Sequence, residues 1–223
     1  VISAPPKDDK TRQIVYGVNE DEYEGEAVVS NASCTTNSVA PVAATLDEQF
    51  GLESGYLTTV HAYTASQNLI DGPHDKPRRG RAAAENVVPT TTGAAKAVTQ
   101  VLPNLAGRLD GMAIRVPVPT GSITQLTVDL ADSPDAGTIN DALRTAADGP
   151  MAGVLGYTDD EVVSRDIVGL PFSSYADLNS TAVVGDDGLA TVLAWYDNEY
   201  GFANRMLDVA RYVAPEASPV APE

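Results

Sequence analysis

The sequence is poor in the residues that form disulfides and structural metal sites. It has one cysteine, Cys34, and two histidines, His61 and His74, among its 223 residues. One thiol cannot close an intramolecular disulfide, and one Cys with two His is a poor ligand set for structural zinc. We therefore expect no metal site, and a reducing, cytoplasmic setting for the chain.

Long apolar runs and basic residues are also scarce. No stretch of about 18 apolar residues occurs, so no membrane-spanning helix is predicted. The chain has 14 Lys and Arg against 31 Asp and Glu, a net charge of −17. Such a charge repels nucleic acid and anionic membranes, and neither is an expected partner. Acidity spread along the chain with few lysines is typical of a halophile's protein; the alternative is an ordinary acidic cytosolic protein.

Two further features are missing: an initiating methionine and a G-x-G-x-x-G phosphate-binding motif. The opening residues VISAPP are typical of a buried strand entering a turn. We interpret the chain as part of a longer protein whose other part lies N-terminal. The alternative is a naturally short chain with a processed methionine.

The apolar pattern predicts an α+β fold, a mixed and largely antiparallel sheet covered by helices. Thr138 is a plausible N-cap for the third helix. We expect helices at 34–51, 93–103, 138–148 and 202–214, strands at 1–5, 13–19, 26–33, 55–64, 112–119 and 122–131, and a hairpin at 181–197 around Asp-Asp-Gly.

The single thiol lies where a strand ends and a helix begins. Ser33, Thr35 and Thr36 add hydroxyl groups around Cys34. Backbone N–H groups and the dipole at a helix N-terminus stabilise an anion and lower the pKa of a thiol. The position predicts an ionised, nucleophilic sulfur, and the alternative is an inert buried cysteine that packs like a small apolar residue.

His61 is the candidate base for this thiol. It lies in the next predicted strand, TTVHAYT, and a strand–helix–strand unit can bring it to Cys34. An imidazole is the natural proton acceptor for a thiol near neutral pH. The alternative is a histidine whose hydrogen bonds are satisfied in the core.

Several basic and hydroxyl groups predict anion binding. Arg78, Arg79 and Arg81 cluster in a long polar loop, and Arg115 lies in an apolar strand where its charge needs a partner. The segment PTTTGAAKA, at 89–97, places hydroxyl groups and a glycine at a helix start, which suits phosphate oxygens. The alternatives are ion pairs with acidic groups or another subunit, and ordinary N-capping.

Five segments together resemble one known family. SNASCTTNSVAP, TTVHAYTASQ, RRGRAAAENVVPTTTGAAKAV, MAIRVPVPTGS and WYDNEYGFANR resemble, in order and spacing, successive segments of glyceraldehyde-3-phosphate dehydrogenase. The resemblance extends over nearly the whole chain up to its tail. It implies that 1–32 is the C-terminal remnant of a NAD-binding Rossmann domain, 33–197 the catalytic domain, and 198–214 a helix that packs on the Rossmann domain. The remaining residues, 215–223, are expected to be a disordered tail.

The same resemblance implies roles for individual residues. Cys34 matches the nucleophile, His61 matches its base, and Asn198 matches the residue that fixes the nicotinamide carboxamide. Thr64 and Arg115 match residues that hold the substrate's phosphate. The remaining implied phosphate-binding residues are Ser33, Thr35, Arg79, Thr92 and Gly93.

The implied reaction is the phosphorylating oxidation of glyceraldehyde 3-phosphate to 1,3-bisphosphoglycerate through a thiohemiacetal and a thioester on Cys34. The implied cofactor is NAD, although Gly72-Pro73, where many NAD-preferring members have Leu-Pro, leaves NADP open. The family also implies inorganic phosphate as a substrate and a homotetramer assembled through an S-shaped loop, 64–86, and the sheet. Three alternatives are erythrose-4-phosphate dehydrogenase, a Cys–His hydrolase, and an inactive fragment that serves only as a folding or interface unit.

Overall fold

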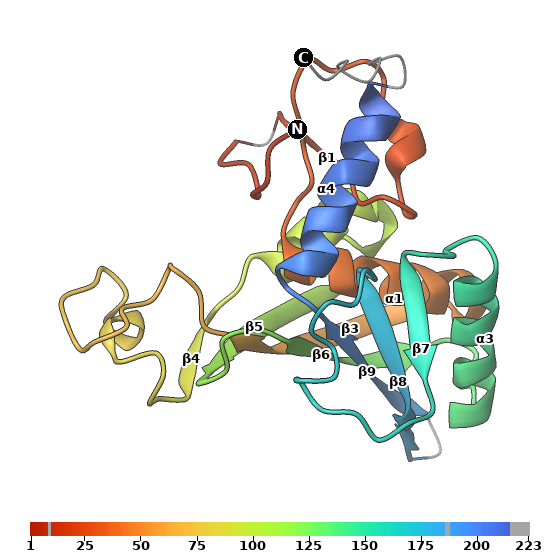
Figure 1. Cartoon of the computed structure of the whole chain (residues 1–223). Helices are drawn as coiled ribbons and strands as arrows, with labels where there is room; N and C mark the ends of the chain where they lie inside the picture. The colour runs from red at the N-terminus through yellow and green to blue at the C-terminus, as the bar shows by residue number, and fades with distance from the viewer. Residues whose placement is uncertain (9, 186–187, 215–223) are drawn as a thin grey trace.

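A seven-stranded sheet forms the body of the molecule. The computed structural model describes residues 1–8, 10–185 and 188–214 of the chain. Across the sheet the strand order is β4-β5-β3-β6-β9-β8-β7 (Figure 1). The strands are β3 (Leu52–Ala62), β4 (Val88–Thr91), β5 (Leu109–Val116), β6 (Ser122–Leu130), β7 (Leu155–Thr158), β8 (Ser174–Val184) and β9 (Leu189–Tyr196).

The sheet is mixed, which confirms the predicted α+β class. β3 is parallel to β5 and β7 is parallel to β8, whereas the other neighbours are antiparallel. The strands on either side of the PTG turn, β5 and β6, are not paired with each other because β3 lies between them. Two short strands, β4 and β7, were missed by the sequence pattern, since four residues are too few to show an alternation.

Helices pack on one face of this sheet. They are α1 (Cys34–Phe50), α2 (Ala94–Val101) and α3 (Ala136–Asp148), while α4 (Tyr200–Val213) extends away from the sheet (Figure 1). Apolar side chains of α1, α2 and α3 form one buried cluster with β3, β6, β8 and β9. The opposite face exposes side chains such as Tyr56, which is 46% accessible.

Helix α1 has the predicted bounds. Ser33 is its N-cap, and the Ser33 hydroxyl accepts a hydrogen bond from the Thr36 N–H at 3.0 Å. Gly51 ends the helix with a φ of 69°, a conformation that suits glycine. The helix continues through Pro41, whose carbonyl accepts a hydrogen bond from the Thr45 hydroxyl at 2.9 Å.

The predicted strand over 13–19 is wrong. The strand β1 covers only Arg12–Gln13, and it pairs with β2, Val29–Ser30. After β1 the chain turns because the Asn19 side-chain oxygen accepts from the Val15 N–H at 2.8 Å and Gly17 has a φ of 84°. Similarly, the predicted strand over 1–5 is reduced to one bridge, between Ile2 and Ser30.

The N-terminal segment packs against α4. Val209 of α4 is fully buried in a cluster with Ile14 and Val29. The Tyr212 ring makes edge-to-face contacts with Tyr16 and Tyr23, with centroids 6.3 and 6.5 Å apart. These apolar contacts tie the two ends of the described chain together, and Figure 1 shows both ends on the same side of the molecule.

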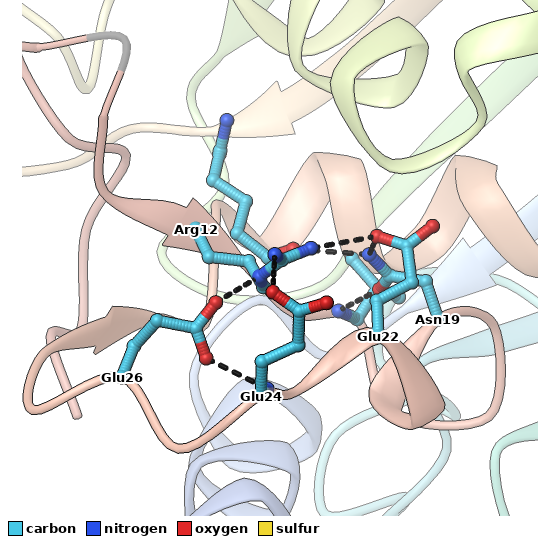
Figure 2. Close-up of polar contacts among 7 residues, drawn as sticks. Arg12, Asn19, Glu22, Glu24 and Glu26 are labelled. Carbon is cyan, nitrogen blue, oxygen red and sulfur yellow. Dashed lines mark hydrogen bonds and ion pairs between the residues drawn. The ribbon is translucent and has the colours of Figure 1, made fainter.

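Charge compensation also organises the N-terminal segment. Figure 2 shows the guanidinium of Arg12 beside three carboxylates, those of Glu22, Glu24 and Glu26. Glu22 also accepts a hydrogen bond from the side-chain amide of Asn19 at 3.2 Å. The positive charge of Arg12 therefore compensates the carboxylates of this loop, which would otherwise repel one another.

The C-terminal half contains the predicted hairpin. β8 and β9 are antiparallel, and Val184 pairs with Leu189. Part of the predicted Asp-Asp-Gly turn, 186–187, lies outside the described residues, as does the predicted disordered tail at 215–223. None of the helices in the described ranges is long and apolar enough to cross a membrane.

The predicted N-cap of α3 is wrong by three residues. The helix begins at Ala136, and the Asp135 carboxylate accepts from the Thr138 N–H at 2.7 Å. Aspartate is preferred to threonine at this position because its charge also interacts favourably with the helix dipole.

We expect Asp135→Ala to lower the thermal unfolding midpoint more than Thr138→Ala does. The Thr138 N–H lowers the pKa of Asp135, so this contribution is present above about pH 4 and is lost as the pH falls through the lower folded-state pKa. Thermal melts of both variants from neutral to acidic pH measure the effect. Equal losses in the two variants would contradict the assignment.

Candidate active site

The site is built on the register between two parallel strands. β3 and β5 pair so that His61 lies directly opposite Arg115, although the two residues are 54 positions apart in sequence. The N-terminus of α1 carries Cys34 to the same place. Three distant segments therefore converge on one point at the end of the sheet.

The thiol and the imidazole are in direct contact. The Cys34 Sγ lies 3.4 Å from the His61 Nε2. On the other side of the ring, Nδ1 is 2.7 Å from the carbonyl oxygen of Ala62. The same Nδ1 lies 3.0 Å from Arg115 Nη1, whose two N–H groups point to the Ala62 carbonyl and the Thr64 hydroxyl. We therefore assign the ring proton to Nδ1, because the Ala62 carbonyl can only accept. This tautomer leaves the Nε2 lone pair facing the sulfur, as a proton acceptor requires.

Burial disfavours the charged form of both members of this pair. It raises the pKa of the Cys34 thiol to about 11, although the Thr35 N–H and the Arg115 charge act in the opposite direction. Burial and the nearby Arg115 lower the pKa of His61 to about 4. Desolvation thus acts against the ionised thiol that the sequence predicted, and the helix N-terminus acts in its favour.

Arg115 forms the first cationic part of the site. One guanidinium nitrogen, Nη1, donates to the Ala62 carbonyl at 2.9 Å and to the Thr64 hydroxyl at 3.2 Å. Burial lowers the pKa of Arg115, and the neighbouring charge of Arg79 does so as well. A cation that is half-buried near another cation favours an anionic ligand.

Arg79 forms a second cationic part near the start of α2. Its Nε donates to the Thr90 hydroxyl at 2.9 Å and its Nη2 to the Thr91 carbonyl at 3.2 Å. The next residues are Thr92, whose hydroxyl accepts from the Ala94 N–H, and the exposed Gly93. A Cβ added to Gly93 would meet no described atom within 4 Å, so the helix N-terminus is open to a ligand.

Asn198 is held at the edge of the same region. Its side-chain oxygen accepts from the Gly121 N–H at 3.2 Å and the Ser122 hydroxyl at 3.0 Å. The Ser122 hydroxyl in turn accepts from the Ala62 N–H, next to His61. The Asn198 amide nitrogen donates to the Glu199 carboxylate at 3.1 Å.

Two residues that support the site, Tyr196 and Asp197, were not predicted from the sequence. The Tyr196 hydroxyl is hydrogen-bonded to Thr35 and Thr59, each at 2.9 Å, and its ring packs edge-to-face on His61 with centroids 5.8 Å apart. Asp197 accepts from the first N–H groups of α4 and from Gly169, which fixes the start of the segment that carries Asn198. The sequence signal for both residues was the polar pair Tyr196-Asp197 at the end of an apolar strand.

The remaining polar candidates lie as follows. Ser33 caps α1, and Thr35 is buried beneath the thiol with its hydroxyl on Tyr196. His74 lies in the loop after β3, where its ring contacts the Ser66 carbonyl and the Lys76 N–H. Within the described residues, no three His, Cys, Asp or Glu side chains gather as a metal site.

The site thus combines a half-buried thiol in contact with an imidazole, two arginines and a helix N-terminus. Covalent chemistry at a cysteine on an anionic substrate requires groups of these kinds. The strand register and the α1 N-terminus produce this arrangement without any residue from outside the chain.

Comparison with known proteins identifies the family. A family profile described as glyceraldehyde 3-phosphate dehydrogenase, C-terminal domain, matches residues 33–198. The chain therefore belongs to the glyceraldehyde-3-phosphate dehydrogenase family, as its sequence motifs predicted.

Similar proteins carry the same family name. The glyceraldehyde-3-phosphate dehydrogenase of Haloarcula vallismortis is 64% identical over 214 residues, which are 96% of this chain and 63% of that protein. Those of Mycolicibacterium smegmatis and Kitasatospora aureofaciens are each 53% identical, over 96% of this chain and 62% and 64% of their own lengths. The chain thus spans less than two thirds of these relatives. A relative from a halophile agrees with the halophilic character predicted from the charge.

We expect His61→Asn to slow alkylation of Cys34 by iodoacetamide at neutral pH roughly tenfold or more, because the thiol loses its proton acceptor. His74→Asn is the matched control, since His74 is the other histidine of the chain and contacts only loop atoms. The adduct is counted by mass spectrometry, and the single cysteine makes the label unambiguous. Equal rates in wild type and His61→Asn would show that the contact does not activate the sulfur.

Proposed function

We propose that the chain is the catalytic part of an enzyme that oxidises glyceraldehyde 3-phosphate to 1,3-bisphosphoglycerate with inorganic phosphate. The observation that carries this proposal is the 3.4 Å contact between Cys34 and His61, beside the Arg115–Thr64 group. A nucleophile and an anion-binding group in one place suit a substrate that is both an aldehyde and a phosphate ester.

The first chemical step is attack by sulfur on the aldehyde carbon. The Cys34 S–H proton passes to the His61 Nε2 as the sulfur–carbon bond forms, and His61 then returns the proton to the aldehyde oxygen to give a thiohemiacetal. A thiolate and an imidazolium 3.4 Å apart attract each other by roughly 5 kcal/mol at an effective dielectric constant of about 20, which offsets much of the cost of separating charge. The N–H groups at the start of α1 can stabilise the developing oxyanion.

The second step transfers the acyl group from sulfur to phosphate. A bound NAD or NADP would supply a hydride acceptor for the thiohemiacetal carbon, and His61 Nε2 would take the hydroxyl proton, which would leave a thioester on Cys34. Phosphate then attacks the thioester, the carbon–sulfur bond breaks, and the acyl phosphate leaves. Covalent attachment thus divides one difficult reaction into two easier steps.

Two anion sites serve the two phosphate groups. Arg115 and Thr64 bind the phosphate that the substrate already carries. Arg79, Thr92 and Gly93 bind the attacking phosphate, because the open N-terminus of α2 supplies N–H donors for it. Ser33 and Thr35 lie at the N-terminus of α1, and we include them among the proposed phosphate-binding residues.

Asn198 is the residue of this chain that fits a nicotinamide carboxamide. Its oxygen is fixed by Gly121 and Ser122, so its remaining N–H has a defined direction. NAD is the proposed cofactor. Gly72 and Pro73 in the loop after β3 leave NADP as the second choice, because a smaller residue at this point can admit the extra phosphate.

We also propose a cytoplasmic homotetramer assembled through the S-shaped loop, 64–86, and the sheet. Figure 1 shows this loop extending away from the sheet beyond β4. Leu69 and Ile70 of the loop are 66% and 80% accessible, and the face of the sheet with Tyr56 is exposed. Exposed apolar groups on a loop and a sheet face favour contact with further subunits.

Activity is tested on this chain joined to the remaining part of the Haloarcula vallismortis relative. We expect NAD(P)H formation from glyceraldehyde 3-phosphate only when phosphate is present, and none from residues 1–223 alone or from Cys34→Ser.

Faster turnover of erythrose 4-phosphate would favour the alternative dehydrogenase, and ester hydrolysis without a dinucleotide would favour a Cys–His hydrolase. Full activity of Cys34→Ser would contradict covalent catalysis.

Arg115→Leu should raise the KM for glyceraldehyde 3-phosphate roughly tenfold to a hundredfold, because a charge-assisted hydrogen bond to the phosphate is lost. Arg78→Leu is the matched control, since this exposed arginine contacts only the Pro89 carbonyl. Steady-state kinetics of both variants in the completed enzyme give the comparison. Equal KM values for the two variants would remove Arg115 from the substrate site.

A further inference from the structure

A strained turn delivers the nucleophile to its base. Between β2 and α1 the chain passes through Ala32, which has a φ of 55°. An alanine in this left-handed region is strained because its Cβ approaches the following carbonyl. Ser33 then returns to an extended conformation, and Cys34 begins α1. The position of the thiol therefore depends on what keeps Ala32 in this conformation.

The side chain of Asn37 spans this turn. Its amide nitrogen donates to the Asn31 carbonyl at 2.8 Å and to the Ser33 carbonyl at 2.9 Å, the residues on either side of Ala32. Asn37 is 1% accessible, so water does not compete for these bonds. Both N–H groups of one amide are thus bound to the backbone of the turn.

The N-cap alone does not fix the turn. The Ser33 hydroxyl contacts Thr36, through the Thr36 N–H at 3.0 Å and the Thr36 hydroxyl at 2.7 Å. Those bonds complete the first turn of the helix and do not reach Asn31. From the side of β2, the Ser30 hydroxyl accepts from the Ala32 N–H at 3.0 Å. Among the described side-chain contacts, the Asn37 amide is the one that connects the helix to both sides of Ala32.

We propose that Asn37 is a positioning residue, which holds the backbone from Asn31 to Ser33 in the strained turn and so places the Cys34 sulfur against His61. The inference rests on the thiol–imidazole pair of the proposed function. It assigns no contact between Asn37 and substrate. The Asn37 amide acts through the backbone that carries the nucleophile.

Position 37 requires a side chain that donates hydrogen bonds. The Asn37 oxygen has no hydrogen-bond partner among the described residues, so the two N–H groups make all the side-chain bonds. An isosteric aspartate presents only acceptors to two carbonyl oxygens and repels them. A leucine of similar size removes the donors without introducing a charge.

The test compares Asn37→Asp and Asn37→Leu with Thr45→Val in residues 1–223. Thr45 is the matched control, because it is also buried on α1 and its hydroxyl also bonds to a backbone carbonyl, that of Pro41. The readout is the pH profile of Cys34 alkylation by iodoacetamide, measured with and without His61→Asn. Circular dichroism establishes which variants are folded.

We expect both Asn37 variants to lose roughly tenfold or more of the neutral-pH alkylation rate, and His61→Asn to have little further effect in them. Thr45→Val should keep the wild-type profile and its full dependence on His61. Should Asn37→Asp fail to fold because of its buried charge, Asn37→Leu alone carries the test.

Folded Asn37 variants that keep the wild-type rate and the full effect of His61→Asn would overturn the proposal. Unfolding of both variants would overturn it as well, because Asn37 would then serve the whole fold rather than the place of the thiol. An unchanged rate in His61→Asn on its own has a different meaning, since it would refute the thiol–imidazole pair of the proposed function.

Discussion

The pairing of β3 with β5 is the constraint on which the site depends. Their parallel register sets His61 beside Arg115, and it also aligns the Ala62 carbonyl that orients the imidazole ring. A one-residue slip of β5 would turn Arg115 to the opposite face of the sheet from His61. The relative position of the imidazole and the guanidinium is therefore set by the strand register. Helix α1 then places the Cys34 sulfur beside the His61 ring.

A buried polar layer supports this arrangement from below. Tyr196 connects Thr35 of α1 with Thr59 of β3, so the helix that carries the thiol and the strand that carries the imidazole share one hydroxyl group. A buried hydroxyl that lost its partners would cost free energy, which favours the native spacing of helix and strand. The same burial disfavours the charged forms of the thiol and the imidazole.

The residues of the thiol–imidazole pair could be predicted from the sequence better than their charge state. The helix at 34–51, the thiol at its start and the histidine in the next strand follow from apolar periodicity and capping residues. The charge state of Cys34 could not follow, because it depends on desolvation by residues far away in sequence. The strands β4 and β7 are too short to show an apolar alternation. The turn at Gly17 and the cap at Asp135 depend on local side-chain hydrogen bonds that outweigh the intrinsic propensities. The roles of Tyr196 and Asp197 depend on tertiary contacts, and a single sequence contains no record of them.

The order of the strands has a kinetic consequence. His61 and Arg115 become neighbours only after the chain between them has closed into a loop that includes the S-shaped segment, β4 and α2. Contacts between residues so distant in sequence form slowly, since their loop-closure entropy must be overcome before any contact is gained. We therefore expect the His61–Arg115 contact to form later in folding than the Cys34–His61 contact, which joins residues only 27 positions apart. A chain that is still immature then has the thiol and the imidazole together before the guanidinium lies beside them.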